Sequence, residues 1–169
     1  MDNIILIGMP GSGKSTLGVV LAKILNYGFV DSDLLIQSRE GKKLYELIDD
    51  YGLEGFLKIE DQVNRHISGR QTVVATGGSA VYNPASMEYL KSTGIVVYLR
   101  VSCGALKKRL GDLDRRGVVI GAGQTLKDLY EERRPYYEKY ADITVDLDGL
   151  SMEEALEKLV YEIESYEES

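Results

Sequence analysis

Residues 3–15 read NIILIGMPGSGKS, and this stretch decides the fold of the chain. Its first five residues form an apolar run rich in β-branched side chains, which is typical of a strand buried on both faces of a parallel sheet. The remainder, from Gly8 to Ser15, fits the pattern G-x-x-x-x-G-K-[ST] without a mismatch. Apolar residues then recur at helical spacing from Leu17 to Leu25. A strand, a glycine-rich loop and a helix in this order predict a site for the phosphates of a nucleotide.

The residue types in this phosphate loop explain how it would hold an anion. Glycines allow the backbone to wrap around phosphate with successive N–H groups pointing inward, and the following helix places its positive end at the same point. We expect Lys14 to reach the β- and γ-phosphates as a catalytic residue, and the Ser15 hydroxyl to ligate Mg²⁺. The candidate ATP-binding residues of the loop are Gly11, Ser12, Gly13, Lys14, Ser15 and Thr16.

A phosphate loop of this kind does not by itself distinguish motors, switches and transferases. The guanine-reading tetrapeptide N-K-x-D of GTPases is absent from the sequence, and large ATPases usually need more chain than 169 residues. A small kinase that phosphorylates a metabolite or a nucleotide therefore fits the sequence best.

Short apolar strands and helical patterns alternate along the rest of the chain. Four further strands are expected, at residues 28–30, 72–75, 95–99 and 143–145. The helical patterns between them start with capping residues, which are Asn83 before Pro84, Ser102, Thr125 with Asp128, and Ser151 with Glu154. This alternation predicts an α/β fold of the P-loop kinase type, with a five-stranded parallel sheet and helices on both of its faces.

Two stretches break the alternation. Residues 33–71 hold about three helical segments and no strand pattern, which predicts a helical lobe over the sheet edge. Residues 111–123 contain several glycines and the adjacent arginines Arg115 and Arg116, without a clear period. This stretch is either an ordinary loop or a mobile lid that carries cationic groups to a ligand. Because the sequence shows no linker or repeat, we expect residues 1–169 to form a single domain.

The composition limits the class of partner. The formal net charge is −7, and residues 146–169 alone carry −8, so the rest of the chain carries +1. This balance argues against nucleic acid and against an anionic membrane surface as partners. The single cysteine, Cys103, excludes an internal disulfide and a cysteine-rich metal site. With no long apolar run and no basic leader, the sequence predicts a cytoplasmic protein, and its size suits a monomer.

Three groups of residues are candidates for the acceptor side of the site. Asp31 and Asp33 follow the second expected strand, and residues two apart in an extended chain face the same way. One carboxylate could hold Mg²⁺ while the other orients or deprotonates a hydroxyl, unless Asp33 simply caps the next helix. Gly77 and Gly78 follow the third strand and would leave backbone N–H groups free for a carboxylate or a hydroxyl. Arg133 is either a surface residue or a clamp for a substrate carboxylate.

Taken in order, these motifs resemble the shikimate kinase family over essentially the whole chain. The resemblance rests on the phosphate loop, the triplet Asp31-Ser32-Asp33, the pair Gly77-Gly78, the arginine-bearing loop around Arg116, and the pattern R-x-P-x-Y ending at Tyr137. It implies that the chain transfers the γ-phosphoryl group of ATP to a hydroxyl of shikimate, with Mg²⁺ as the cofactor.

The resemblance also implies a role for each matching residue. Asp31 would support the metal, and Asp33 would bind the acceptor hydroxyls and act as the base. Arg116 on the lid would stabilise the transferring phosphate, and Arg133 would hold the shikimate carboxylate. Arg109 would lie against the adenine of ATP.

Three positions depart from the family pattern. Leu57 stands where a second carboxylate-binding arginine is expected, Ser79 takes the third place of a glycine triplet, and Gly117 follows Arg116 where proline is usual. Helical spacing places Leu57 at the edge of a buried face, toward the cleft, and points Lys58 away from that face.

These departures concern acceptor recognition and leave the phosphate chemistry unchanged. They keep open the alternative that the same chemistry acts on another polyol, a sugar acid or a nucleotide. A second alternative is a nucleotide-binding regulator without catalysis, and the presence of Asp33 and Arg116 argues against it.

Overall fold

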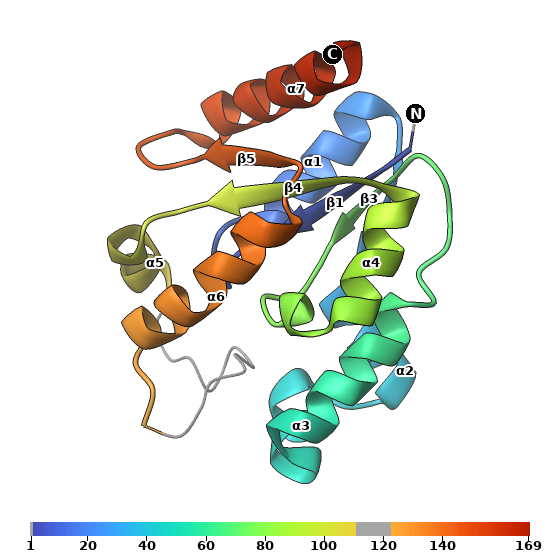
Figure 1. The fold of residues 1–169 in the computed structure, drawn as a ribbon, viewed down its shortest axis with the longest axis vertical. Helices are drawn as coiled ribbons and strands as arrows, with labels where there is room; N and C mark the ends of the chain where they lie inside the picture. Colours follow the sequence, from blue (N-terminus) through green and yellow to red (C-terminus); the bar gives the residue numbers. More distant parts are fainter. Residues whose placement is uncertain (1, 111–122) are drawn as a thin grey trace.

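Within residues 2–110 and 123–169, which the computed structural model describes, five parallel strands form one sheet (Figure 1). Across the sheet the strands follow the order β2 (Gly28–Asp31), β3 (Thr72–Ala75), β1 (Asn3–Ile7), β4 (Gly94–Arg100) and β5 (Ile143–Asp146). Every neighbouring pair is parallel. The five-stranded parallel sheet predicted from the sequence is therefore confirmed.

Helices cover both faces of this sheet (Figure 1). On one face, α1 (Lys14–Leu25) packs on β1, β2 and β3, α7 (Met152–Glu168) packs on β5, and the two helices contact each other. On the other face, α4 (Pro84–Thr93) packs on β1 and β4, and α6 (Leu126–Tyr140) packs on β4. The short helix α5 (Cys103–Arg109) follows β4 and contacts α6. This layering is the one that the alternating sequence pattern predicts.

Strand β1 lies at the centre of the sheet, between β3 and β4. Its residues from Ile4 to Ile7 are at most 1% exposed, because helices cover both faces of the strand. Burying one such side chain stabilises the fold by about 1.5–3 kcal/mol. The phosphate loop starts at the next residue, Gly8, so the best-packed strand of the core fixes its position.

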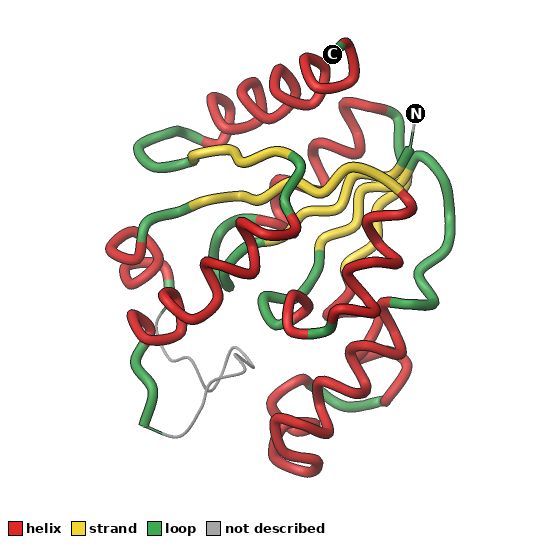
Figure 2. Tube along the Cα trace, in the orientation of Figure 1, coloured by secondary structure: helices red, strands yellow, loops and turns green. Residues whose placement is uncertain are grey.

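A helical lobe connects β2 to β3 (Figure 2). It consists of α2 (Ser32–Glu40) and α3 (Leu44–Asn64), and α3 is broken at Gly52, whose φ of 70° and ψ of 178° are not helical. The three helical segments predicted in this region are therefore confirmed. The lobe has an apolar cluster of its own, formed by Ile36, Leu47, Phe56 and Val63.

The predicted starts of the helices are largely confirmed. Ser102, Thr125 and Ser151 each accept a hydrogen bond from the backbone N–H three residues later. Asn83 differs, because its side chain donates to the carbonyl oxygen of Leu57 at 3.2 Å. Asn83 immediately precedes α4 and follows the short helix η1 (Ala80–Tyr82), so this bond ties the segment after β3 to the lobe.

The acidic C-terminal segment forms α7, which buries Ala155, Leu159 and Ile163 and leaves most of its acidic side chains in solvent. None of the helices within the two described ranges has the length and apolar character needed to cross a membrane. Residues 111–122, which make up nearly all of the predicted lid and include Arg116, lie outside the described residues.

Candidate active site

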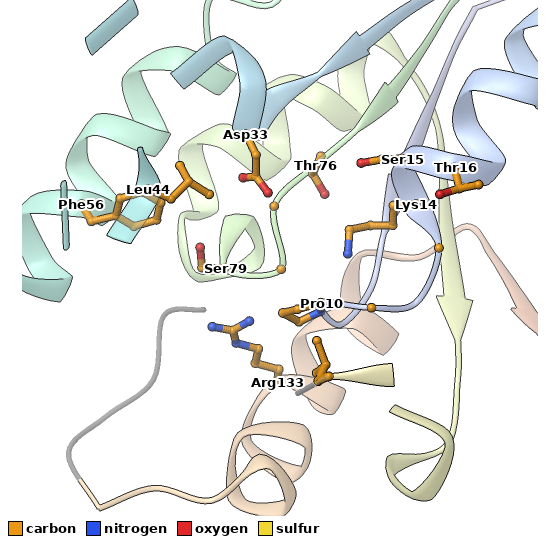
Figure 3. A pocket seen from close by; sticks show the side chains of 15 residues that line it. Pro10, Lys14, Ser15, Thr16, Asp33, Leu44, Phe56, Thr76, Ser79 and Arg133 are labelled. Atoms are coloured by element: carbon orange, nitrogen blue, oxygen red, sulfur yellow. The ribbon is translucent and has the colours of Figure 1, made fainter. Parts of the chain in front are cut away.

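A cavity of about 350 Å³ lies where the strands end, next to the lobe (Figure 3). Its polar lining comes from the phosphate loop after β1, Asp33 after β2, residues 76–79 after β3, and Arg133 of α6. Leu44 and Phe56 of the lobe add apolar side chains. Open α/β sheets bind ligands at the carboxyl ends of their strands, and this cavity has that position. Residues predicted for the donor side and for the acceptor side therefore share one cavity.

The phosphate loop holds its lysine inward. Lys14 is 8% exposed, and its Nζ donates to the carbonyl oxygens of Gly8 at 2.7 Å and Met9 at 2.9 Å. Burial lowers the pKa of Lys14 from 10.5 to about 8, although the nearby Asp33 carboxylate acts in the opposite direction. An anion entering the cavity would favour the charged form of this lysine, which suits a phosphate-binding role.

Two glycines of the loop take backbone conformations that other residues rarely adopt. Gly11 has a φ of 80° and Gly13 a φ of 100°, both in the left-handed region. Gly13 is the residue that caps α1, and residues 13–16 line the cavity. The positive end of the α1 dipole therefore faces the space where phosphates would lie.

Ser15 and Asp31 are brought together, as the sequence predicts for a metal site. The Ser15 Oγ donates to Asp31 Oδ2 at 2.6 Å, and Asp31 Oδ1 accepts from the backbone N–H of Leu34 at 3.1 Å. Asp31 is thus the residue that caps α2. The alternative that Asp33 serves as this cap is wrong.

The geometric reason for pairing Asp31 with Asp33 is also wrong. Strand β2 ends at Asp31 and α2 begins at Ser32, so the two carboxylates are not two apart in an extended chain. Strands β1 and β2, which lead to the phosphate loop and to Asp31, are separated in the sheet by β3. Asp33 still lines the cavity from the first turn of α2, and burial raises its pKa from 3.8 to about 6, against the effect of Lys14.

The glycine pair after β3 lies against side chains on both sides. A Cβ added to Gly77 would lie 2.6 Å from Asp33 Oδ1 and 2.8 Å from Glu60 Oε2. A Cβ added to Gly78 would lie 2.7 Å from Arg133 Nη1. Larger residues would displace these groups, so glycine is needed here for close approach of the backbone to side chains that line or flank the cavity.

Arg133 is a buried cavity residue and not a surface one. It is 1% exposed, its Nε donates to the Tyr82 hydroxyl at 3.2 Å, and its guanidinium lies 5.2 Å from the centre of the Tyr82 ring. The Tyr137 hydroxyl, one helical turn later, donates to the Gly78 carbonyl oxygen at 2.7 Å. These contacts hold α6 against the glycine pair and direct Arg133 into the cavity (Figure 3).

Sequence reasoning missed a buried carboxyl group beside the cavity. Glu60 is fully buried, and the Ser79 Oγ lies 2.8 Å from its Oε1 and 3.0 Å from its Oε2. Burial raises the pKa of Glu60 from 4.5 to about 8. A signal was present, because Glu60 falls between Phe56 and Val63 at helical spacing on an apolar face, where a charged residue is unusual.

Leu57 lies at the edge of the buried face, as its spacing predicts, because it is partly buried against the apolar cluster of the lobe. The lobe residues among the described lining of the cavity are Asp33, Leu44 and Phe56. Lys58 points away as predicted, since its side chain is 75% exposed and pairs with Glu54. Neither residue at positions 57 and 58 therefore brings a cation to the cavity.

A second cavity, of about 220 Å³, adjoins the phosphate loop. Arg109 lines it, and its Nη1 donates to the Gly11 carbonyl oxygen at 3.0 Å. The remaining lining is mainly apolar and comes from the phosphate loop, α1 and the β5–α7 region, namely Ser12, Gly13, Thr16, Leu17, Leu147, Leu150, Ser151, Met152 and Ala155. A guanidinium beside apolar side chains is suited to a flat aromatic base.

Comparison with known proteins gives consistent matches. The family model for shikimate kinase matches residues 10–164. The shikimate kinase of Thermodesulfovibrio yellowstonii is 36% identical over 167 residues, which cover 97% of this chain and 96% of that relative. Shikimate kinase from Acinetobacter baumannii, solved in complex with shikimate, has a TM-score of 0.85 and 29% identity, covering 98% of this chain and 94% of that one. The enzyme from Aquifex aeolicus has a TM-score of 0.83 and 32% identity, with 96% of each chain covered.

Proposed function

This chain belongs to the shikimate kinase family, and we propose that it phosphorylates a hydroxyl of shikimate with ATP in the cavity beside the lobe. One arrangement supports this proposal. Lys14 of the phosphate loop, Asp33 of the lobe and Arg133 of α6 line the same cavity. A cation for phosphate, a carboxylate for a hydroxyl and a guanidinium for a carboxylate are the groups that this reaction requires.

The donor nucleotide would span both cavities. Its phosphates would lie on the phosphate loop, where Lys14 exchanges its carbonyl partners, Gly8 and Met9, for phosphate oxygens. Its adenine would lie in the second cavity against Arg109. Ser12, Gly13 and Thr16 line that second cavity, and Gly13 and Thr16 line the first as well, so the two spaces meet at the loop.

Ser15 and Asp31 fit a magnesium site. They offer a hydroxyl and a carboxylate oxygen 2.6 Å apart, and Mg²⁺ prefers oxygen ligands. This ion usually keeps several waters and binds one or two protein groups together with substrate phosphates, so two protein oxygens suffice. When bound there, it would supply positive charge to the phosphates of ATP. Asp31 is held in place for this role by its bond to the N–H of Leu34.

The acceptor would lie between the lobe and the glycine pair. Arg133 would hold the shikimate carboxylate, and Asp33 would accept hydrogen bonds from its hydroxyls. The backbone of Gly77 and Gly78 would approach the substrate closely, because neither residue carries a side chain. Phe56 and Leu44 would cover the carbon ring.

Transfer would proceed in line. The acceptor oxygen forms a bond to the γ-phosphorus while the bond to the bridging oxygen of the β-phosphate breaks, and ADP leaves. The proton of the attacking hydroxyl passes to an oxygen of Asp33. Lys14 balances the charge that spreads over the phosphate oxygens. By family resemblance Arg116, which lies outside the described residues, would do the same from the lid.

Several broader features belong to the same proposal. Residues 1–169 would act as one domain, in which residues 33–71 bind the substrate, and nearly all of the lid predicted at residues 111–123 lies outside the described residues. The protein would work as a monomer in the cytoplasm, with Mg²⁺ and ATP, and without nucleic acid or membrane partners. The net charge of −7 supports the absence of polyanionic partners.

A second candidate is the same chemistry on a different acceptor. The observation that favours it is the apolar packing of Leu57, since neither Leu57 nor the exposed Lys58 lines the cavity. Losing one charge-assisted contact weakens binding of a carboxylate by roughly 1.5–3 kcal/mol. Gluconate and nucleoside monophosphates are the alternative acceptors to compare.

The test is ATP consumption measured through ADP release, with each acceptor supplied separately. Turnover with shikimate that exceeds turnover with gluconate and with nucleoside monophosphates supports the proposal. Turnover with another acceptor and none with shikimate would leave the kinase chemistry in place and overturn the substrate.

A further inference from the structure

Helix α3 places a carboxyl group behind the wall of the acceptor cavity. Glu60 is fully buried, and the Ser79 Oγ donates to its Oε1 at 2.8 Å and to its Oε2 at 3.0 Å. Ser79 lines the cavity next to Gly78, and Figure 3 shows it among the labelled lining side chains with Asp33 and Arg133. The serine hydroxyl therefore connects a buried carboxyl group to the surface that an acceptor would touch.

Several titratable or charged groups surround the carboxyl group of Glu60. The titratable or charged groups that face it come from four helices and are Lys14 on α1, Asp33 on α2, Asp61 on α3, and Arg133 and Tyr137 on α6. The carboxyl groups of Asp33 and Glu60 both lie close to Gly77, since a Cβ added there would be 2.6 Å from Asp33 Oδ1 and 2.8 Å from Glu60 Oε2. An ionised Glu60 would place a second negative charge beside Asp33. Burial is the largest cause that raises the pKa of Glu60 to about 8, and it outweighs the hydrogen bond from Ser79 and the charge of Arg133, which both lower the pKa.

The proton on Glu60 decides how the Ser79 hydroxyl is used. In the structure the Ser79 Oγ donates to Glu60. A protonated carboxyl group can reverse this bond and donate its O–H to the Ser79 Oγ, which leaves the serine O–H free to donate toward the cavity. An ionised carboxylate can only accept, so the serine O–H donates its hydrogen bond to Glu60. The serine Oγ can then only accept a hydrogen bond from a ligand in the cavity. The first state suits an anionic ligand, and the second disfavours one.

We propose that Ser79 and Glu60 form a specificity-determining pair, in which protonated Glu60 frees the Ser79 hydroxyl to donate to the carboxylate of the acceptor. The inference rests on the proposed function, because it takes the acceptor to be a hydroxy acid held by Arg133. Arg133 is the one cation on the acceptor side among the described lining residues, since Lys14 belongs to the phosphate loop. Ser79 thus supplies a second contact to the carboxylate from a neutral group.

Equilibrium binding of shikimate without nucleotide, measured by calorimetry at pH 6.5 and pH 9, tests this pair. The dissociation constant of the wild type should rise about 10-fold or more at the higher pH, as a charge-assisted hydrogen bond is lost. The Glu60→Gln variant has no proton to lose and should show a much smaller rise. Titration of Lys14 and Asp33 is common to both proteins, so the difference between them reports on Glu60.

Two further variants complete the design. Ser79→Ala should bind shikimate about 10-fold more weakly than the wild type at pH 6.5 and should lose most of the pH effect. Glu54→Gln is the matched control, because Glu54 lies on the same helix with its side chain 89% exposed. It should keep the wild-type constants at both pH values. Ser79→Ala also carries the test if Glu60→Gln does not fold.

The outcomes separate this inference from the proposed function. Equal pH dependence in the wild type and in the variants, or no binding of shikimate at either pH, overturns the inference. Binding with the expected pH difference but no phosphate transfer from ATP supports the pair and overturns the proposed function. Phosphorylation of shikimate, with the same pH dependence of shikimate binding in both variants as in the wild type, supports the proposed function and overturns the pair.

Discussion

The Ser15 hydroxyl donates a hydrogen bond to Asp31 Oδ2 at 2.6 Å, and this bond joins the first turn of α1 to the residue that caps α2. Ser15 follows β1 and Asp31 is the last residue of β2, and these two strands are separated in the sheet by β3. The bond therefore crosses the carboxyl end of β3. It places two oxygen ligands of the kind that Mg²⁺ prefers beside the phosphate loop.

The Asp31→Asn variant should need more magnesium than the wild type. The amide keeps an oxygen that can accept from the Leu34 N–H but loses the negative charge, so the Mg²⁺ concentration for half-maximal activity should rise about 10- to 100-fold. The midpoint of thermal unfolding should stay close to that of the wild type. Asp31→Ala should in addition lose about 1 kcal/mol of unfolding free energy, because the cap of α2 is removed. An unchanged magnesium titration for Asp31→Asn would exclude Asp31 from the metal site.

The Lys14→Ala variant should lose ATP-dependent phosphorylation of shikimate. The ammonium group is the buried cation of the phosphate loop, and removing it takes away charge that the transferring phosphate requires. Product formation should be measured by ADP release and compared with Lys58→Ala, whose lysine is 75% exposed and outside the cavity. Wild-type turnover in Lys14→Ala would contradict the assigned role.

The Asp33→Asn variant should lower kcat by roughly 10²- to 10⁴-fold, because an amide cannot take the proton of the attacking hydroxyl. The fold should survive, since Asp31 and not Asp33 caps α2. Asp49→Asn is the control, because Asp49 is an exposed carboxylate on α3 of the same lobe. A kcat for Asp33→Asn within error of the wild type would remove Asp33 from the proton transfer.

The free energy of unfolding should depend on pH through Glu60. The folded protein keeps the Glu60 proton up to about pH 8, whereas the unfolded chain releases it near pH 4.5, so the folded state binds more protons between these values. Stability therefore falls as pH rises through this window. Relative to Glu60→Gln, the wild type should lose on the order of 3–5 kcal/mol between pH 4.5 and pH 8. Urea titrations at several pH values measure the free energy of unfolding of both proteins. The same dependence of this free energy on pH in the wild type and in Glu60→Gln would contradict the prediction.

The parts of the fold that local patterns encode are the parts that the sequence predicts well. Strand β1 and the phosphate loop form one continuous segment, in which an apolar run and a glycine pattern are both complete. The Thr125–Asp128 capping box is equally local, and it is present in the structure. The lobe helices follow from spacing, although the break at Gly52 depends on a single left-handed residue.

The features that depend on distant contacts were not predictable in this way. Asp33 reaches the cavity because α2 starts at Ser32, one residue after Asp31. An interpretation of residues 31–33 as extended chain does not predict this helix start. The place of β3 between β1 and β2 is set by packing of the whole sheet. The bond between Ser79 and Glu60 joins residues 19 apart on different elements. The burial of Arg133 depends on Tyr82, which the sequence places 51 residues earlier.

The central claim is that this chain uses ATP to phosphorylate shikimate, and the most direct measurement is the initial rate of ADP release with and without shikimate in the presence of Mg²⁺. We predict that shikimate raises this rate many-fold and that phosphorus NMR shows one new phosphate ester in equal amount to the ADP formed. An ADP release rate that is the same with and without shikimate, with no new ester signal, would contradict the claim.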